Sequence, residues 1–181
     1  QINPVIAEAY DLLQKAAART DGLSGLESGF SKLDKMTSGW QNSDLIIIAA
    51  RPAMGKTAFV LSMARNIAVN FRHPVALFSL EMSNVQLVNR LIVNVCEIPG
   101  EKIKSGQLAP YEWQQLDYKL KDLIDAPLYV DDTPSLSVFE LRTKARRLVR
   151  EHGVRVIIID YLQLMNASGM SYGSRQEEVS T

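Results

Sequence analysis

The sequence predicts an α/β fold in which a mostly parallel β-sheet carries helices on both of its faces. Short apolar runs alternate along the chain with segments of helical periodicity, and the first and last runs are rich in isoleucine and valine. The chain has 181 residues, 46% of them hydrophobic, which is enough for one domain with a substantial core. Parallel strands joined by crossover helices end at the same edge of their sheet, so functional residues are expected at that edge.

The chain opens with a segment that predicts an amphipathic helix, from Pro4 to Ala18. Its apolar residues recur at helical spacing, and proline suits the first turn of a helix. A glycine- and serine-rich stretch, residues 19–29, predicts a loop or linker after it. A helix attached in this way either packs on its own domain or docks on a neighbouring subunit, and the sequence leaves both interpretations open.

The alternating elements of the main domain follow in order. Strands are predicted at residues 45–50, 75–80, 128–130 and 154–159. Helices are predicted at residues 55–70, 84–95, 110–124 and 137–151, and the last of them opens with the capping-box spacing of Ser137 and Glu140. A glycine- and serine-rich loop is expected at residues 166–174.

Composition excludes several classes of protein. Lys and Arg total 20, as do Asp and Glu, so the zero net charge gives no bulk signature of nucleic-acid binding. The single cysteine, Cys96, excludes a disulfide framework, favours a reducing cytosol, and is expected to be a core residue. No apolar run reaches the roughly 20 residues that a membrane span needs. The first residues do not form a signal peptide, and the absence of an initial Met indicates a start within a longer protein.

A Gly-Lys-Thr sequence between a predicted strand and a predicted helix is the sharpest functional feature. Residues 50–57 read ARPAMGKT, and backbone amides at a helix N-terminus bind phosphate, so the segment predicts an ATP site. Lys56 is expected to bridge the β- and γ-phosphates, and Thr57 to bind Mg²⁺ through its hydroxyl. Ala50 stands where such loops usually begin with glycine, and the alternative is a solvated turn with a chance Gly-Lys-Thr. The residues expected to contact nucleotide are Ala50, Arg51, Pro52, Ala53, Met54, Gly55, Lys56, Thr57 and Ala58.

Three apolar runs end in an acidic residue, namely Glu81, Asp131 and Asp160. Parallel strands bring such residues to the sheet edge where the phosphate loop lies. Hydrolysis of Mg·ATP needs a carboxylate near the metal and a group that orients or deprotonates the attacking water. Asp160 ends a run with the form of a Walker B strand and is predicted on the metal side, with Glu81 as the general base. The predicted catalytic residues are therefore Glu81 and Lys56, and the predicted magnesium ligands are Thr57 and Asp160.

Two other charged clusters have plainer interpretations. Asp131 and Asp132 look like a metal pair, but they precede a Thr-Pro-Ser turn and are expected to accept hydrogen bonds from turn and helix-start amides. The basic residues of the segment 142–155 include three at i,i+4 spacing, which favours a solvated or ion-paired helix face. The two histidines, His73 and His152, are far apart in sequence, so a transition-metal site is not expected.

The amino-acid sequences of the motifs resemble those of one known family. The segments are GFSKLDKMTSG (29–39), DLIIIAARPAMGKT (44–57), FSLEMS (78–83), VDDTP (130–134), IDYLQLM (159–165) and RQEEVS (175–180). Together they resemble the RecA-like motor domain of bacterial DnaB-type replicative DNA helicases, almost without gaps from about Gly22 to Ser180. Alanine at position 50 is typical of that family. The Arg51-Pro52 pair argues against RecA-type recombinases and clock-type ATPases, whose loops read differently.

The resemblance implies a hexameric ring that hydrolyses ATP and unwinds duplex DNA at the replication fork by moving along single-stranded DNA. It implies work in the cytoplasm, with primase and a helicase loader as partners. Lys56 and Thr57 carry over as phosphate and Mg²⁺ ligands, Glu81 as the catalytic glutamate and Asp160 as the Walker B aspartate. The chain then divides into a linker helix, residues 1–20, which docks on the neighbouring subunit, and the N-terminal part of a RecA-like ATPase domain, residues 21–181. The loop after Met165 corresponds to a region that faces the central channel.

The sequence departs from the family pattern at both ends. The family places a helical primase-binding domain before the linker helix. Past Ser180 it continues with a strand carrying a phosphate-sensing glutamine, then a DNA-binding loop and an arginine finger for the next subunit's ATP. In RecA-like folds that strand lies between the phosphate-loop strand and the Walker B strand. The sequence therefore predicts a sheet that is incomplete on its C-terminal side, and a fragment that hydrolyses ATP poorly alone.

Two other functions are compatible with these motifs. The first is that of another RecA-like ATPase, such as a recombination mediator or a signalling ATPase, and stimulation of ATP hydrolysis by single-stranded DNA separates it from a helicase. The second is that of a non-catalytic module that binds nucleotide only to stabilise an interface. Glu81 and Asp160 argue against such a module, because passive binding requires no water-orienting carboxylate.

Overall fold

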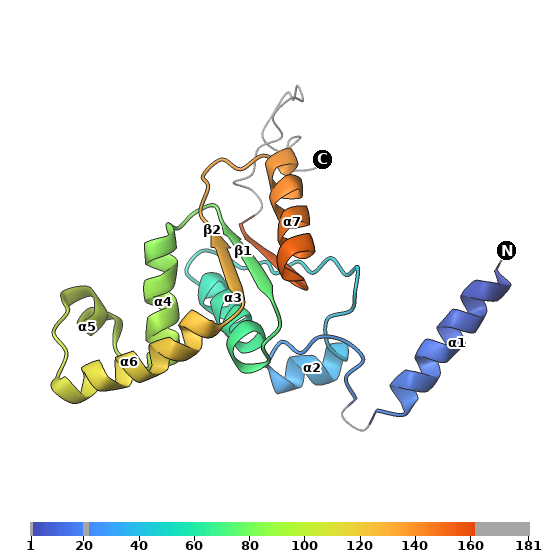
Figure 1. The fold of residues 1–181 in the computed structure, drawn as a ribbon, viewed down its shortest axis with the longest axis horizontal. Coiled ribbons are helices and arrows are strands. Elements are labelled where there is room, and N and C mark those ends of the chain that lie inside the picture. Colours follow the sequence, from blue (N-terminus) through green and yellow to red (C-terminus); the bar gives the residue numbers. More distant parts are fainter. Residues whose placement is uncertain (1, 20–21, 162–181) are drawn as a thin grey trace. The chain divides into compact units, whose positions relative to one another are not determined.

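The computed structural model describes residues 2–19 and 22–161, which divide between Ala49 and Ala50 into two compact units. Figure 1 shows the elements along the chain. The helices are α1 (Asn3–Ala17), α2 (Ser31–Thr37), α3 (Lys56–Arg65), α4 (Asn84–Cys96), α5 (Gly100–Ser105), α6 (Pro110–Asp125) and α7 (Val138–His152), and α3 continues into a π-helical turn, η1 (Asn66–Asn70). The strands are β1 (Val75–Ser79), β2 (Leu128–Asp131) and β3 (Val156–Asp160). The expected boundary between residues 20 and 21 stays a prediction, and the loop expected at 166–174 lies outside the described residues.

In the first unit, the predicted N-terminal helix is confirmed as α1. Proline occupies its first turn, where the missing amide costs nothing, and an i,i+4 ion pair of 2.8 Å joins Lys15 to Asp11. None of its residues is buried. The large apolar side chains of α1 and of its N-cap residue, Ile2, are all more than half exposed: Ile2, Val5, Ile6, Tyr10, Leu12 and Leu13.

Helix α2 was not predicted from the sequence. Its N-terminus is stabilised by Asp34, whose carboxylate accepts hydrogen bonds from the amide of Ser28 at 2.9 Å and from that of Gly29 at 3.2 Å. The helix lies between the two ends of an antiparallel bridge that pairs Leu26 with Trp40. A capping acid normally precedes the helix, whereas Asp34 lies inside it, so the usual start signal is missing.

The strand predicted at residues 45–50 is wrong. No described strand pairs with this run, and the side chains of Leu45 and Ile47 are 87% and 78% exposed. An apolar run becomes a strand only where a neighbour supplies its backbone hydrogen bonds. The apolar pattern alone does not show whether such a neighbour is present.

The second unit contains a parallel three-stranded sheet in the order β2-β1-β3. Val75 at the start of β1 is paired with Leu128 of β2 and with Val156 of β3, so the three strands begin level with one another. At the other end, Ser79 is paired with Asp160. The predicted strands at 75–80, 128–130 and 154–159 are confirmed with small shifts at their ends, and their carboxyl ends share one edge, as expected.

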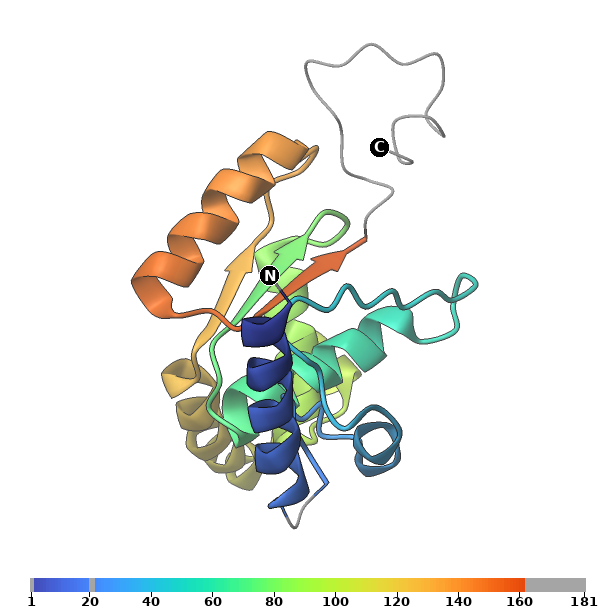
Figure 2. The same cartoon turned by 90° about the vertical axis from the view of Figure 1, so that its right-hand side faces the viewer.

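Helices cover both faces of this sheet, as the sequence predicts. Every residue of β1 is buried. Phe78 belongs to a buried cluster against which Leu141 and Leu148 of α7 pack. Because side chains alternate along a strand, Leu77 points to the opposite face, and Figures 1 and 2 show α3 and α4 on that side. Asp160 also points there, since its neighbour Ile159 packs on the α7 face.

The helices predicted in the second unit are confirmed. Residues 55–70 form α3 and η1 as one continuous helical segment. Helix α4 begins with a capping box in which Ser83 and Gln86 exchange hydrogen bonds of 3.3 and 3.0 Å. The predicted capping box of Ser137 and Glu140 opens α7. Reciprocal bonds of this kind satisfy amides that have no partner within the helix, so they fix where each helix starts.

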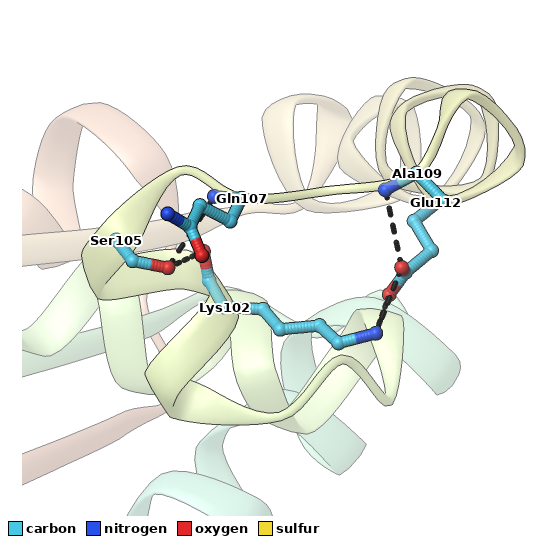
Figure 3. A network of polar contacts seen from close by, with 5 residues as sticks. All are labelled: Lys102, Ser105, Gln107, Ala109 and Glu112. Carbon is cyan, nitrogen blue, oxygen red and sulfur yellow. Dashed lines mark hydrogen bonds and ion pairs between the residues drawn. The ribbon is translucent and has the colours of Figure 1, made fainter.

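An ion pair ties α5 to the start of α6, as Figure 3 shows. Lys102 Nζ lies 2.8 Å from a carboxylate oxygen of the buried Glu112, which also accepts a bond of 3.2 Å from the amide of Ala109. The hydrogen bond from Lys102 and then the one from Ala109 lower the pKa of Glu112, and the bond to Glu112 raises the pKa of Lys102. Helix α5 was not predicted, because it is a short segment without apolar periodicity.

Candidate nucleotide and magnesium site

The phosphate loop lies immediately before α3. Gly55 occupies the N-cap with φ of +83°, a left-handed conformation that side chains rarely adopt, and Ala53 also has positive φ. A Cβ added at Gly55 would meet nothing within 4 Å, so the backbone conformation, and not space, requires glycine here. Residues 51–55 are exposed, which leaves the amides at the helix start accessible to a phosphate.

The first two residues of α3 converge on Asp160 at the end of β3. The Thr57 hydroxyl donates a hydrogen bond of 3.1 Å to Asp160 Oδ2, and Lys56 Nζ lies 3.1 Å from Asp160 Oδ1. Asp160 is only 4% exposed. The Lys56 ammonium also lies 4.1 Å from the ring centre of Tyr161, a cation–π contact that was not predicted. The structure thus brings together three of the four predicted catalytic and metal-binding residues.

The oxygens of Thr57 and Asp160 suit a magnesium ion. Mg²⁺ prefers octahedral oxygen ligands at about 2.1 Å, and in nucleotide sites it takes one or two protein ligands, with phosphates and waters completing the set. Adjacent ligands of such an octahedron are about 3 Å apart, from the same geometry. The separation of 3.1 Å between Thr57 Oγ1 and Asp160 Oδ2 is close to that value. The chemistry and spacing of these two oxygens therefore fit a magnesium ion.

Glu81 lies on the loop that follows β1, next to this cluster along the sheet edge. The amide of Leu80 donates a bond of 2.9 Å to the carbonyl of Asp160, so the loop begins beside the end of β3. The Glu81 side chain is exposed. Within residues 22–161, no hydrogen bond or ion pair joins Glu81 to Lys56, Thr57 or Asp160. The position of Glu81 at the sheet edge is therefore compatible with its predicted role as general base. That role also depends on the contacts that hold the loop after β1 in position.

The carboxylates of Asp131 and Asp132 accept hydrogen bonds from different protein groups. Asp131 accepts hydrogen bonds from the Thr133 amide at 2.9 Å and from Lys144 Nζ at 2.8 Å. Burial alone raises the pKa of Asp131, but the bonds from Lys144 and Thr133 outweigh it and leave the pKa below its usual value. Asp132 Oδ2 accepts from the amide of Asn84, the first residue of α4, at 2.9 Å. The expectation that these acids satisfy turn and helix-start amides is confirmed.

Comparison with known proteins decides the family. The family model described as DnaB-like helicase C terminal domain matches residues 25–181. The chain belongs to this family. Over 179 residues it is 45% identical to the replicative DNA helicase DnaB of Geobacillus stearothermophilus and 43% identical to the replicative DNA helicase DnaC of Bacillus subtilis. Each match covers 99% of this chain and 39% of the relative, so the chain spans about two fifths of these proteins.

Solved structures of related proteins have the same fold. One solved chain, described as an ATPase domain, superposes with a TM-score of 0.90 at 33% identity, covering 99% of this chain and 63% of that one. A DnaB-like replicative helicase, described with its interactions with primase, superposes with a TM-score of 0.85 at 33% identity, covering 99% and 43%. The RecA-like α/β fold inferred from the motifs is therefore confirmed.

The remaining predictions for this DnaB-like domain concern its surface and its single cysteine. The arginines at i,i+4 spacing on α7, Arg142, Arg146 and Arg150, are exposed, as expected of a solvated face. Burial raises the pKa of the Cys96 thiol, which supports its role as a core residue. Within the described part of the chain, no group of three metal-ligating side chains occurs and no helix is long and apolar enough to cross a membrane.

Proposed function

We propose that this chain is part of an ATP-dependent replicative DNA helicase that unwinds duplex DNA by translocating on single-stranded DNA. The observation that carries the proposal is the convergence of Lys56 and Thr57 on the buried Asp160 at the start of α3. A phosphate-loop lysine and hydroxyl beside a strand-end carboxylate suit phosphoryl transfer from Mg·ATP. The family match supports DNA as the polymer along which the protein moves.

Each residue of the site has a proposed role. The backbone of residues 50–58 surrounds the phosphates, and Lys56 neutralises charge on the β- and γ-phosphates. Lys56 is paired with Asp160 in this structure, so it must exchange that carboxylate for phosphate oxygens when ATP binds. Thr57 and Asp160 hold Mg²⁺, which supplies neutralisation of the charge that develops on the phosphates. Glu81 orients and deprotonates the attacking water.

The assembly and its partners are also proposals. We assign residues 1–20 to a linker helix that docks on a neighbouring subunit of a homo-hexamer, and residues 21–181 to the ATPase domain. The exposed apolar side chains of α1 support docking, because an amphipathic helix is stable when its apolar face is covered. Single-stranded DNA, primase and a helicase loader are the proposed partners. One solved relative is described with its interactions with primase. We place the protein in the cytoplasm.

ATP turnover by the full-length protein tests this function. Steady-state hydrolysis is measured with and without single-stranded DNA, and strand separation is followed on a forked duplex. A helicase shows DNA-stimulated hydrolysis together with ATP-dependent strand separation. DNA-stimulated hydrolysis without strand separation would point instead to another RecA-like ATPase, such as a recombination mediator. A rate of ATP hydrolysis that is the same with and without single-stranded DNA would point to a signalling ATPase.

A further inference from the structure

The loop that carries Glu81 is held at both of its ends. Where it leaves β1, the Ser79 hydroxyl donates a bond of 2.8 Å to the carbonyl of Met82 and accepts one of 3.1 Å from the Met82 amide. The bond from the Leu80 amide to the carbonyl of Asp160 fixes the same end against β3. Where the loop enters α4, the anchor is the bond of 2.9 Å from the Asn84 amide to the Asp132 carboxylate.

The Asp132 anchor differs from the other two because it comes from the end of β2 and holds the end of the loop that enters α4. Asp132 follows β2, and its partner Asn84 lies 48 positions earlier in the chain. The first amides of a helix have no partner within the helix, and a carboxylate there is further stabilised by the helix dipole. The neighbouring Asp131 does not take part in this bond. Its carboxylate accepts hydrogen bonds from the Thr133 amide and from Lys144 of α7. Asp132 is therefore the link between the end of β2 and the start of α4.

We propose that Asp132 is a positioning residue for Glu81: by binding the first amide of α4 it sets where the Glu81 loop stands at the edge of the sheet. This inference rests on the proposed role of Glu81 as general base. Glu81 is exposed and makes no ion pair within the described residues, so the backbone of its loop, and no side-chain partner, sets the region that its carboxylate can reach. A displacement of about 1 Å in a catalytic group can cost up to about 100-fold in rate.

The test compares Asp132→Ala, Asp132→Asn and Glu81→Gln in the full-length protein. Asp132→Ala removes the acceptor, so kcat for ATP should fall about 10- to 100-fold while KM and Mg·ATP affinity stay unchanged. Asp132→Asn keeps an oxygen that can accept from Asn84 and should retain kcat within a few-fold. In the Glu81→Gln background, Asp132→Ala should lower kcat no further, because the group it positions has already lost its function.

A matched control removes a helix-start acceptor elsewhere. Ser137→Ala deletes the cap of α7, which accepts from the Glu140 amide at 3.1 Å, and should leave kcat unchanged. Should Asp132→Ala fail to fold, Asp132→Ser, whose shorter side chain moves the acceptor oxygen away from the Asn84 amide, replaces it in every comparison. Loss of Mg·ATP affinity in a folded variant would overturn the inference.

The outcomes separate this inference from the proposed function. If Glu81→Gln abolishes turnover but Asp132→Ala does not lower kcat, the inference is overturned and the base assignment stands. The inference is also overturned if Asp132→Asn loses as much as Asp132→Ala, since charge and not the bond would then matter, or if the losses multiply in the double variant. If Glu81→Gln turns over normally, the base assignment fails and the inference fails with it.

Discussion

The hydroxyl of Thr57 donates a hydrogen bond of 3.1 Å to the carboxylate of Asp160, across 103 positions of sequence. The bond joins the first turn of the phosphate-loop helix to the last residue of β3. The parallel pairing of β1 with β3 carries Asp160 to the same level of the sheet as Ser79, so the loop bearing Glu81 begins at this edge as well. The phosphate loop, the metal-side carboxylate and the candidate base therefore depend on one strand register.

Replacing Lys56 with alanine should abolish ATP hydrolysis by the full-length protein. The variant loses the positive charge that is expected to move from Asp160 to the phosphates, and that charge matters most in the transition state. Steady-state ATPase assays and binding of a fluorescent ATP analogue measure the loss. Lys104→Ala, at an exposed lysine of α5, is the control and should hydrolyse normally. Unchanged turnover in Lys56→Ala contradicts the placement of the phosphates.

Replacing Glu81 with glutamine should separate binding from chemistry. Glutamine keeps the shape of the side chain but cannot accept a proton, so Mg·ATP should bind normally while turnover falls by about 10²- to 10⁴-fold. A single-turnover measurement with saturating enzyme isolates the chemical step. Glu101→Gln, at an exposed acid on α5, should behave as the unaltered protein does. A binding defect with no chemical defect would remove Glu81 from the role of base.

Replacing Asp160 with asparagine should change the magnesium requirement. The amide oxygen can still accept from Thr57, but the charge that attracts the cation is lost. Titration of ATPase activity with MgCl₂ should show half-activation at a concentration about 10-fold higher or more, in the range that altered metal-site partners cause. Asp117→Asn, on the exposed side of α6, should leave the titration curve in place. An identical curve for Asp160→Asn would show that this carboxylate is not on the metal side.

Stability in acid should depend on Glu112. Its pKa is lowered in the folded chain, first by the bond from Lys102 and then by that from Ala109, so the folded state resists protonation more than the unfolded state does. The stabilisation is therefore present above the ordinary carboxyl pKa of about 4.3 and is lost as the pH falls through the lowered value. The raised pKa of Lys102 keeps its charge throughout this range.

Urea unfolding midpoints, measured between about pH 6 and pH 3, report this dependence. Glu112→Gln should have a lower midpoint near neutral pH and should lose less on acidification. Glu101→Gln, which removes an exposed acid, should follow the parent curve. An equally steep acid dependence in Glu112→Gln would mean that the pair with Lys102 does not control stability.

The sequence was most informative where a local pattern and a long-range rule agree. Lys56 and Thr57 follow from a Gly-Lys-Thr at a helix start, and Asp160 follows from an apolar run that ends in an acid. The rule that parallel strands end at one edge then brings them together. The run at 45–50 has an equally strong apolar pattern, but it forms no strand because no described strand pairs with it. An apolar run indicates that a segment could form a strand. It does not indicate whether another strand will pair with that segment.

For other contacts the sequence did not indicate both partners. Asp132 was expected to satisfy a turn or helix-start amide, but nothing indicated that the amide would be that of Asn84. The contact depends on β1 and β2 ending side by side, which is a property of the assembled sheet. Helix α2 was missed for a similar reason, since its stabilising acid, Asp34, bonds to residues of the preceding loop and lies outside the usual capping position.

The structure of the full-length protein with Mg²⁺ and a non-hydrolysable ATP analogue tests the central claim most directly. We expect the triphosphate against residues 50–58, with Lys56 Nζ moved from Asp160 to the β- and γ-phosphates. We also expect Mg²⁺ at about 2.1 Å from Thr57 Oγ1, with Asp160 on the metal side. A triphosphate bound elsewhere, or a Lys56 that stays paired with Asp160 while the phosphates are in place, would contradict the proposed site.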